Sequence, residues 1–190
     1  MTSKSLLESL NPKGHLEIIK RYTNGKTEVV LSDHNIITVG MGITLAYLFE
    51  NTDTTNDASD FAAAYFQIGN GSALMVSSLT QLGDPINNSE YGESDLTLST
   101  VAIGGTGGAV SKEVAFINPT YISRNGTKII YSLGLQESAC NLIAIDEIGL
   151  YTKNPTGSTH PFAYLCAYRS FPAITKTDAF ALIFKWTIEF

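Results

Sequence analysis

Few residues of this chain are of the types that perform chemistry, and their spacing does not gather them into a site. The two cysteines are Cys140 and Cys166, and the three histidines are His15, His34 and His160. Zinc sites place Cys and His ligands at short, regular spacings, which these five residues do not share. Free cysteine is among the most often buried residue types. We therefore predict two buried thiols in preference to a disulfide or a metal site.

The pair Asp146-Glu147 could supply acid–base chemistry. Adjacent residues of a strand point to opposite faces, so the two carboxylates would not share a site. Since unpaired charge is rarely buried, we expect one acid to face solvent and the other to hydrogen-bond to a turn or a neighbouring strand. His15 and His34 are expected to be polar residues of a hairpin, and His160 a loop residue.

Local signatures of catalysis are missing. The chain contains no Gly-x-Ser-x-Gly, His-Glu-x-x-His or Cys-x-x-Cys. The run Gly104–Gly108 lacks the Lys-Ser or Lys-Thr of a phosphate-binding loop, so a flexible turn explains its glycines. The loop Asn51–Asp60 lacks the glycine and glutamate of a calcium-binding hand, although irregular calcium sites also arise from such loops. We predict no catalytic, cofactor-binding or metal-binding residues, and a protein that is not an enzyme.

Composition narrows the possible partners. Hydrophobic residues make up 44% of the chain and charged residues 16%, below the ~25% of an average domain, which indicates a lightly charged globular protein. The net charge of −6 argues against direct binding of nucleic acid or of an anionic membrane. No apolar run reaches the ~18–20 residues that span a bilayer, and Met1–Ser9 does not resemble a signal peptide, so we expect synthesis and folding in a cytoplasm.

The pattern of apolar residues predicts strands. From Ala179 to Phe190 bulky residues alternate without interruption, as in a half-buried strand, and we expect the chain to end inside its own core. Asn-Gly turns at Thr23-Asn24-Gly25 and Arg124-Asn125-Gly126 predict hairpins. The other expected strands are His15–Tyr22, Lys26–Leu31, Phe61–Ile68, Asp95–Ile103, Lys112–Ile122, Thr127–Leu135, Asn141–Tyr151 and Pro161–Phe171.

The remaining segments complete the predicted architecture. A spacing of three to four residues predicts a helix over Asn35–Glu50, and Ser3–Leu10 fits a short helix. Ser72–Ser94 is expected to be an extended loop and Pro172–Asp178 a connector. We predict an antiparallel β-sandwich of about eight or nine hairpin-connected strands with one or two short helices near the N-terminus. A single domain over 15–190 would follow an N-terminal arm over 1–14.

Aromatic residues could either build stacking platforms for sugars or bases, or fill the core. Most of them occupy alternate positions of predicted strands, which favours the core. The residues expected there include Phe162, Tyr164, Tyr168, Phe180, Phe184 and Trp186. The freer candidates for exposed contacts are Tyr22, Tyr91 and Tyr121.

Three segments carry recognisable motifs. Phe171–Ile188 contains Phe-Pro-x-Ile-x-Lys followed by an alternating strand that ends in Trp-Thr-Ile. Ile145–Tyr151 contains Ile-x-Glu-Ile-Gly-Leu-Tyr, and Phe66–Gly71 ends in Ile-Gly-x-Gly. In these motifs, and in the opening strand Gly14–Tyr22 and the helix Asn35–Leu48, the chain resembles a family of tailed-bacteriophage structural proteins. Ile148 stands where that family often has alanine.

The resemblance implies a small, mostly β virion component present in many copies, with no catalytic residue. We expect a non-enzymatic structural protein, assembled in the bacterial host cytoplasm, that forms a homo-oligomer. It would dock onto other virion proteins at the tail, neck, baseplate or fibre-attachment region. One alternative is a capsid decoration or cement protein whose N-terminal arm clasps capsid subunits.

A second alternative is a receptor-binding or glycan-binding module, because loops on a β scaffold commonly carry binding. Its candidate loops are Asn51–Asp60, Ser72–Ser94 and Thr152–His160. An enzyme such as a depolymerase is the third class, which the absence of a recognisable catalytic site disfavours.

Overall fold

The structure, a computed structural model, describes residues 12–50, 59–86, 98–105, 108–116, 119–153 and 163–190. These residues form ten strands, one α-helix and one short 3-10 turn. In chain order they are β1 (Lys13–Tyr22), β2 (Thr27–Ile37), α2 (Val39–Glu50), β3 (Ala63–Gly69), β4 (Leu98–Gly105), β5 (Gly108–Phe116), η1 (Pro119–Tyr121), β6 (Ile122–Asn125), β7 (Lys128–Leu135), β8 (Ala144–Thr152), β9 (Leu165–Thr175) and β10 (Phe180–Glu189). The predicted class, mainly β and antiparallel with a helix near the N-terminus, is confirmed.

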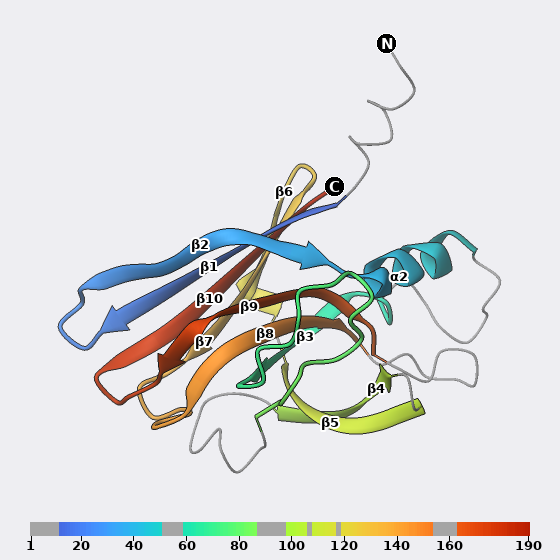
Figure 1. The fold of residues 1–190 in the computed structure, drawn as a ribbon. Helices are drawn as coiled ribbons and strands as arrows, with labels where there is room; N and C mark the ends of the chain where they lie inside the picture. Colours follow the sequence, from blue (N-terminus) through green and yellow to red (C-terminus); the bar gives the residue numbers. More distant parts are fainter. Residues whose placement is uncertain (1–11, 51–58, 87–97, 106–107, 117–118, 154–162) are drawn as a thin grey trace.

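The ten strands form one sheet, in the order β4-β5-β3-β8-β9-β2-β1-β10-β7-β6. Each pair of neighbouring strands is antiparallel. Strand β2 belongs to both halves of the sheet, because residues 27–35 pair with β1 whereas Ile36 and Ile37 pair with β9. The sheet curls at β2, so that its two halves lie over each other as layers (Figure 1).

The hydrophobic core lies between these layers. The rings of Phe66 in β3 and Trp186 in β10 stack with centroids 6.1 Å apart, and Phe171 in β9 lies 6.4 Å from Phe184 in β10. At least two strands separate β3 and β9 from β10 in the sheet order, so these contacts join one layer to the other. One wall of the core is the alternating face of β10, as predicted, with Phe180, Leu182, Phe184, Trp186 and Ile188 buried.

The predicted hairpins are present in the structure. Gly25, with φ of 83°, lies in the turn between β1 and β2, and Gly126, with φ of 60°, in the turn between β6 and β7. Positive φ is the conformation for which these tight turns need glycine. The third predicted hairpin corresponds to the antiparallel pair β8 and β9.

Two element boundaries near the predicted helix and connector differ from expectation. The helix begins at Val39 rather than Asn35, because Asn35 pairs with β1 and Ile36 with β9. The connector expected from Pro172 is instead the end of β9, because Ile174 and Thr175 pair with β8. In both cases hydrogen bonding to a distant strand outweighs the local pattern.

Two further expectations are wrong. The strand predicted over Lys112–Ile122 is divided between β5, which pairs with β3 and β4, and β6, which pairs with β7. Phe190 is 41% exposed and lies after the end of β10, so the last side chain is not in the core.

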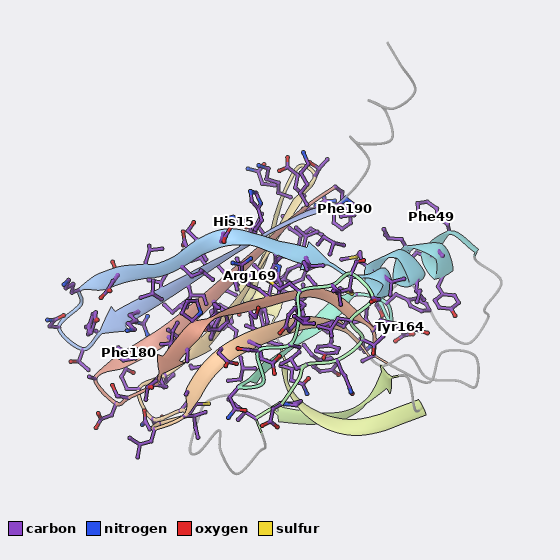
Figure 2. All side chains as sticks on the ribbon, in the orientation of Figure 1. His15, Phe49, Tyr164, Arg169, Phe180 and Phe190 are labelled. Atoms are coloured by element: carbon purple, nitrogen blue, oxygen red, sulfur yellow. The ribbon has the colours of Figure 1, made fainter. Side chains whose placement is uncertain are left out.

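Helix α2 packs against the beginning of β9. The Thr38 hydroxyl, just before the helix, donates to the Leu165 carbonyl oxygen. A Cβ atom on Gly40 would lie 2.1 Å from the same oxygen, so only glycine permits this approach. Figure 2 shows Phe49, near the end of the helix, pointing away from the sheet.

Candidate functional site

Glu147 in β8 carries a fully buried carboxylate. Its Oε1 atom accepts hydrogen bonds from the backbone N–H groups of Gly71 (3.1 Å) and Asp84 (2.8 Å). Its Oε2 atom accepts from the N–H groups of Gly83 (3.0 Å) and Ala73 (3.4 Å). The Tyr168 hydroxyl of β9 also donates to Oε2, at 2.9 Å. Glu147 therefore anchors both ends of the loop that follows β3.

Glycines allow the loop to approach this carboxylate. A Cβ atom on Gly69 would lie 2.5 Å from Oε1 of Glu147, and one on Gly71 would lie 2.2 Å from the backbone nitrogen of Asp84. Such distances exclude a side chain unless the backbone moves. The Ile-Gly-x-Gly and Ile-x-Glu motifs, far apart in the sequence, thus meet at one buried hydrogen-bond cluster.

The prediction for the acid pair is confirmed. Asp146 is partly exposed and accepts a hydrogen bond from the Ser72 N–H at 3.1 Å, whereas Glu147 is buried and bonds the N–H groups of Gly71 and Ala73. The two carboxylates therefore hold three consecutive N–H groups of the same loop.

Two buried tyrosines border the Glu147 cluster. Burial and the neighbouring Glu147 carboxylate raise the pKa of the Tyr168 phenol above its ordinary value. Burial likewise raises the pKa of Tyr151, whose hydroxyl donates to Gln67 Oε1 at 3.1 Å. Both phenols therefore stay protonated as hydrogen-bond donors at neutral pH.

A second buried charge lies beside the beginning of β8, where the Lys176 N–H donates to the Ile143 carbonyl oxygen. Lys176, the lysine of the Phe-Pro-x-Ile-x-Lys motif, is fully buried. Its ammonium donates to the carbonyl oxygens of Thr177 (2.7 Å) and Glu137 (3.1 Å) and to Asn141 Oδ1 (3.3 Å). It also lies 5.3 Å from the ring centroid of Phe180. Burial lowers the pKa of Lys176 below its ordinary value.

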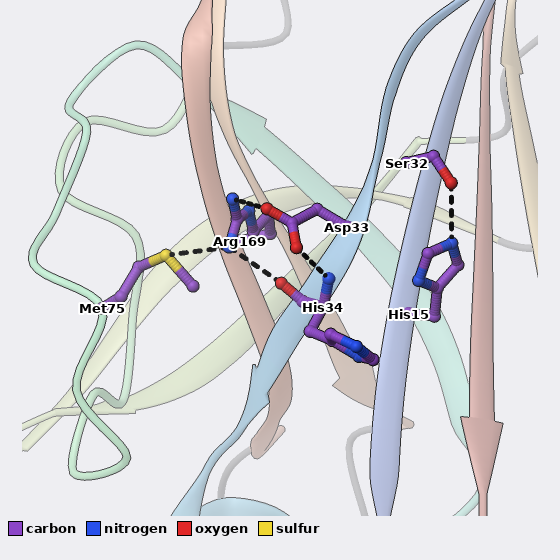
Figure 3. Close-up of polar contacts among 6 residues, drawn as sticks. All are labelled: His15, Ser32, Asp33, His34, Met75 and Arg169. Carbon is purple, nitrogen blue, oxygen red and sulfur yellow. Dashed lines mark hydrogen bonds and ion pairs between the residues drawn. The ribbon is translucent and has the colours of Figure 1, made fainter.

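A polar cluster lies where β2 passes from one layer to the other (Figure 3). Arg169 of β9 donates to the Asp33 carboxylate at 2.7 Å and to the His34 carbonyl oxygen at 2.8 Å. The Met75 sulfur lies 3.5 Å from the same guanidinium. The His34 backbone N–H and Arg169 lower the pKa of Asp33. The ion pair ties β2 to β9, and the Met75 contact links Arg169 to the loop after β3.

The other candidates from the sequence occupy varied positions. Cys140 and Cys166 are buried free thiols, as predicted, and burial raises the pKa of Cys166 to about 12. Tyr121 is 63% exposed, and the Tyr22 hydroxyl donates to Glu28 at 2.8 Å. Candidates that lie outside the described residues are Tyr91, His160, Phe162, the helix Ser3–Leu10, most of Asn51–Asp60 and of Thr152–His160, and residues 87–94 of Ser72–Ser94.

Five exposed apolar side chains occur on α2 and on the loop that adjoins its first turn. The Val39 N–H donates to the Ser77 carbonyl oxygen at 2.7 Å, so the first turn of α2 adjoins this loop. We call the exposed apolar residues of both segments the α2 face. They are Val39, Leu48, Phe49, Leu74 and Val76. Phe49 and Leu74 are 86% and 81% exposed, and the sequence pattern alone did not mark either of them.

Glu147 and Lys176 anchor loops of the fold. The polar atoms of Glu147 and Lys176 are used by protein partners. Within the described ranges, no group of three or more His, Cys, Asp or Glu side chains is placed to hold a metal ion. Helix α2 and the short η1 turn are both too short to cross a membrane, and no described helix meets that length.

Comparisons of the chain with protein-family models, with curated proteins and with solved structures find no match.

Proposed function

We propose that this chain is a non-enzymatic structural protein of a tailed-bacteriophage virion. Copies of it would associate and dock onto other virion proteins at the tail, neck, baseplate or fibre-attachment region. The observation that carries the proposal is the α2 face, a set of exposed apolar side chains on a helix whose start bonds β9 and on a loop that Glu147 anchors.

The buried Glu147 carboxylate holds the loop that carries Leu74. Burying a carboxylate is expensive unless it is fully hydrogen-bonded, and here four backbone N–H groups and a phenol are committed to it. Their effect is to hold a loop whose Leu74 points into solvent. Exposed apolar side chains on a rigid scaffold suit protein–protein contact, because little conformational entropy is lost on binding. The motifs shared with phage structural proteins supply the virion context.

The first test is immunogold electron microscopy of particles of the phage that encodes this chain, with an antibody against it. Label at the tail, neck or fibres is the expected result. Label spread over the head would make it a decoration protein instead, and unlabelled particles would contradict a virion role.

A second test addresses the α2 face itself. The double variant Phe49→Ser, Leu74→Ser should lose incorporation into particles while its thermal unfolding stays close to that of the wild type. The matched control is Leu142→Ser, since Leu142 is 84% exposed but precedes β8, whereas α2 packs against Leu165 of β9, which pairs with Tyr151 near the other end of β8. Equal loss in both variants would contradict docking through the α2 face.

A further inference from the structure

Two histidine side chains lie side by side on the outer surface of the hairpin formed by β1 and β2. His15 and His34 are directly opposite each other in the antiparallel register, so their side chains leave the sheet on the same face. Their ring centroids are 5.8 Å apart and the ring planes are nearly perpendicular, at 79° (Figure 3).

A β-bulge produces this pairing. Ile19 is opposite Val29, but Ile18 is opposite Leu31, so Val30 is the extra residue on β2. Beyond the bulge the partners are shifted by one position. Without the shift, His15 would be opposite Asp33, and His34 would point to the other face of the sheet.

The separation of the rings suits a shared metal ion. Zinc–imidazole bonds are about 2.0–2.1 Å long, and a ring nitrogen lies about 1.1 Å from the ring centroid, which puts the metal about 3.2 Å from each centroid. Two such ligands at a tetrahedral angle have centroids about 5.2 Å apart. The observed 5.8 Å therefore requires only small side-chain rotations to match.

Ser32 orients one of the two rings. The His15 Nε2 atom lies 3.1 Å from Ser32 Oγ. With the Nε2–H group donating to this oxygen, the lone pair of Nδ1 is left free to bind a metal. Histidines that bind metals commonly donate their second ring N–H to an oxygen in this way. Asp33 is not available as a further ligand, because its carboxylate already bonds Arg169 and the His34 N–H.

We propose that His15 and His34 bind one divalent transition-metal ion of the zinc, nickel and copper class. Nδ1 of His15 and a ring nitrogen of His34 are the protein ligands, and water fills the remaining positions. Imidazole suits these ions, whereas magnesium and calcium prefer oxygen. This site is independent of the α2 face and of the proposed virion role.

The test is a titration of the tag-free protein with zinc. Calorimetry measures the affinity, and NMR of the imidazole nitrogens identifies the ligand atoms. His15→Asn and His34→Asn should each weaken zinc binding at least tenfold, and Ser32→Ala should weaken it about tenfold. His160→Asn is the matched control and should leave zinc binding unchanged. Magnesium in place of zinc should not bind the wild-type protein. The fluorescence of Trp186 reports whether each variant is folded.

Several outcomes would overturn the proposal. They are no zinc binding at millimolar concentration, equal binding by the two His variants and the wild type, or a loss in His160→Asn as large as theirs. The NMR signal of His15 tests the geometry separately, because coordination through Nε2 in place of Nδ1 would contradict the role assigned to Ser32.

Discussion

Glu147 and Lys176 are both fully buried charges, and each is surrounded by neutral partners. The carboxylate is held by backbone N–H groups and a phenol, whereas the ammonium is held by carbonyl and amide oxygens and an aromatic ring. Since a carboxylate only accepts and an ammonium only donates, each selects the opposite kind of backbone group. Both residues act as loop anchors rather than as reactive groups.

The two anchors differ in the length of chain that they fix. Glu147 contacts residues 63 to 76 positions away in the sequence, at both ends of the loop after β3. Lys176 contacts its neighbour Thr177 and residues 35 and 39 positions away, in the connection between β7 and β8. The Glu147 loop carries Leu74 of the α2 face, so losing this anchor should affect both stability and docking.

The largest expected effect is that of Glu147→Gln. The variant places an NH2 group against backbone N–H donors and removes the charge that they stabilise. We expect a loss of about 3–5 kcal/mol in the free energy of unfolding. Urea denaturation followed by the fluorescence of Trp186 measures it.

Asp146→Asn is the matched control, because Asp146 accepts one N–H bond at a partly exposed position. Its expected loss is below about 1 kcal/mol. A similar loss in both variants would show that burial of Glu147 is not what holds the loop.

Lys176→Met should have a smaller effect. It leaves three oxygens without their donor, but methionine fills the same volume and removes the cost of burying a charge. We expect a loss of about 1–3 kcal/mol in urea denaturation. Lys128→Met, at an exposed ion pair with Glu189, should lose less than about 0.5 kcal/mol. A loss above that of Glu147→Gln would reverse the order of the two anchors.

Around the two anchors, Tyr168 and Lys176 should change the pH dependence of stability in opposite directions at alkaline pH. The pKa of Tyr168 is raised in the folded state, so above pH ~10 the unfolded chain releases the phenolic proton first and stability falls. Tyr168→Phe should therefore flatten the decline by up to about 1.4 kcal/mol per pH unit. Urea denaturation at several pH values between neutrality and pH ~11 measures this slope.

The contribution of Lys176 to stability changes with pH in the opposite direction. Its pKa is lowered in the folded state, so just below the ordinary lysine pKa the unfolded chain binds more protons and stability rises with pH. Lys176→Met should make the alkaline decline steeper, whereas Lys128→Met should not. Parallel slopes in Tyr168→Phe and Lys176→Met would contradict this difference.

The smallest expected change in the free energy of unfolding is that of substitutions at Leu142, which bonds Lys176. Leu142 donates its N–H to the Lys176 carbonyl oxygen and has a φ of 67°, a conformation that costs L-residues about 1–2 kcal/mol. Its side chain is exposed, so Leu142→Gly should raise the free energy of unfolding by about 0.5–1 kcal/mol. Leu142→Ala keeps the strained φ and should give no gain, and thermal unfolding of the pair distinguishes them.

Most elements of the fold could be predicted because their signals are local. The alternation in β10 and the Asn-Gly turns at Gly25 and Gly126 depend on residues that are close in sequence. The errors occurred where long-range pairing decides the outcome. Asn35 to Ile37 joined β2 rather than the helix, and the single strand expected over Lys112–Ile122 was divided, because β5 pairs with β3 and β4 whereas β6 pairs with β7.

The candidate sites were predicted less well. The motifs that contain Glu147, Gly69 and Gly71 were visible in the sequence, but their meeting was not, because it requires β3 and β8 to be neighbours. The α2 face escaped prediction for a similar reason. An apolar residue of a helix or loop is exposed or buried according to what packs against it, and sequence spacing does not report that packing.

The amino-acid sequence by itself determined the antiparallel β class, the turn positions and the different exposure of Asp146 and Glu147, since each follows from the geometry of neighbouring residues. Only the tertiary structure decided that His15 faces His34, because one extra residue at Val30 shifts the register of the whole hairpin beyond it. It also decided which polar groups surround Glu147 and Lys176, because burial and hydrogen bonding depend on segments brought together by the curl of the sheet.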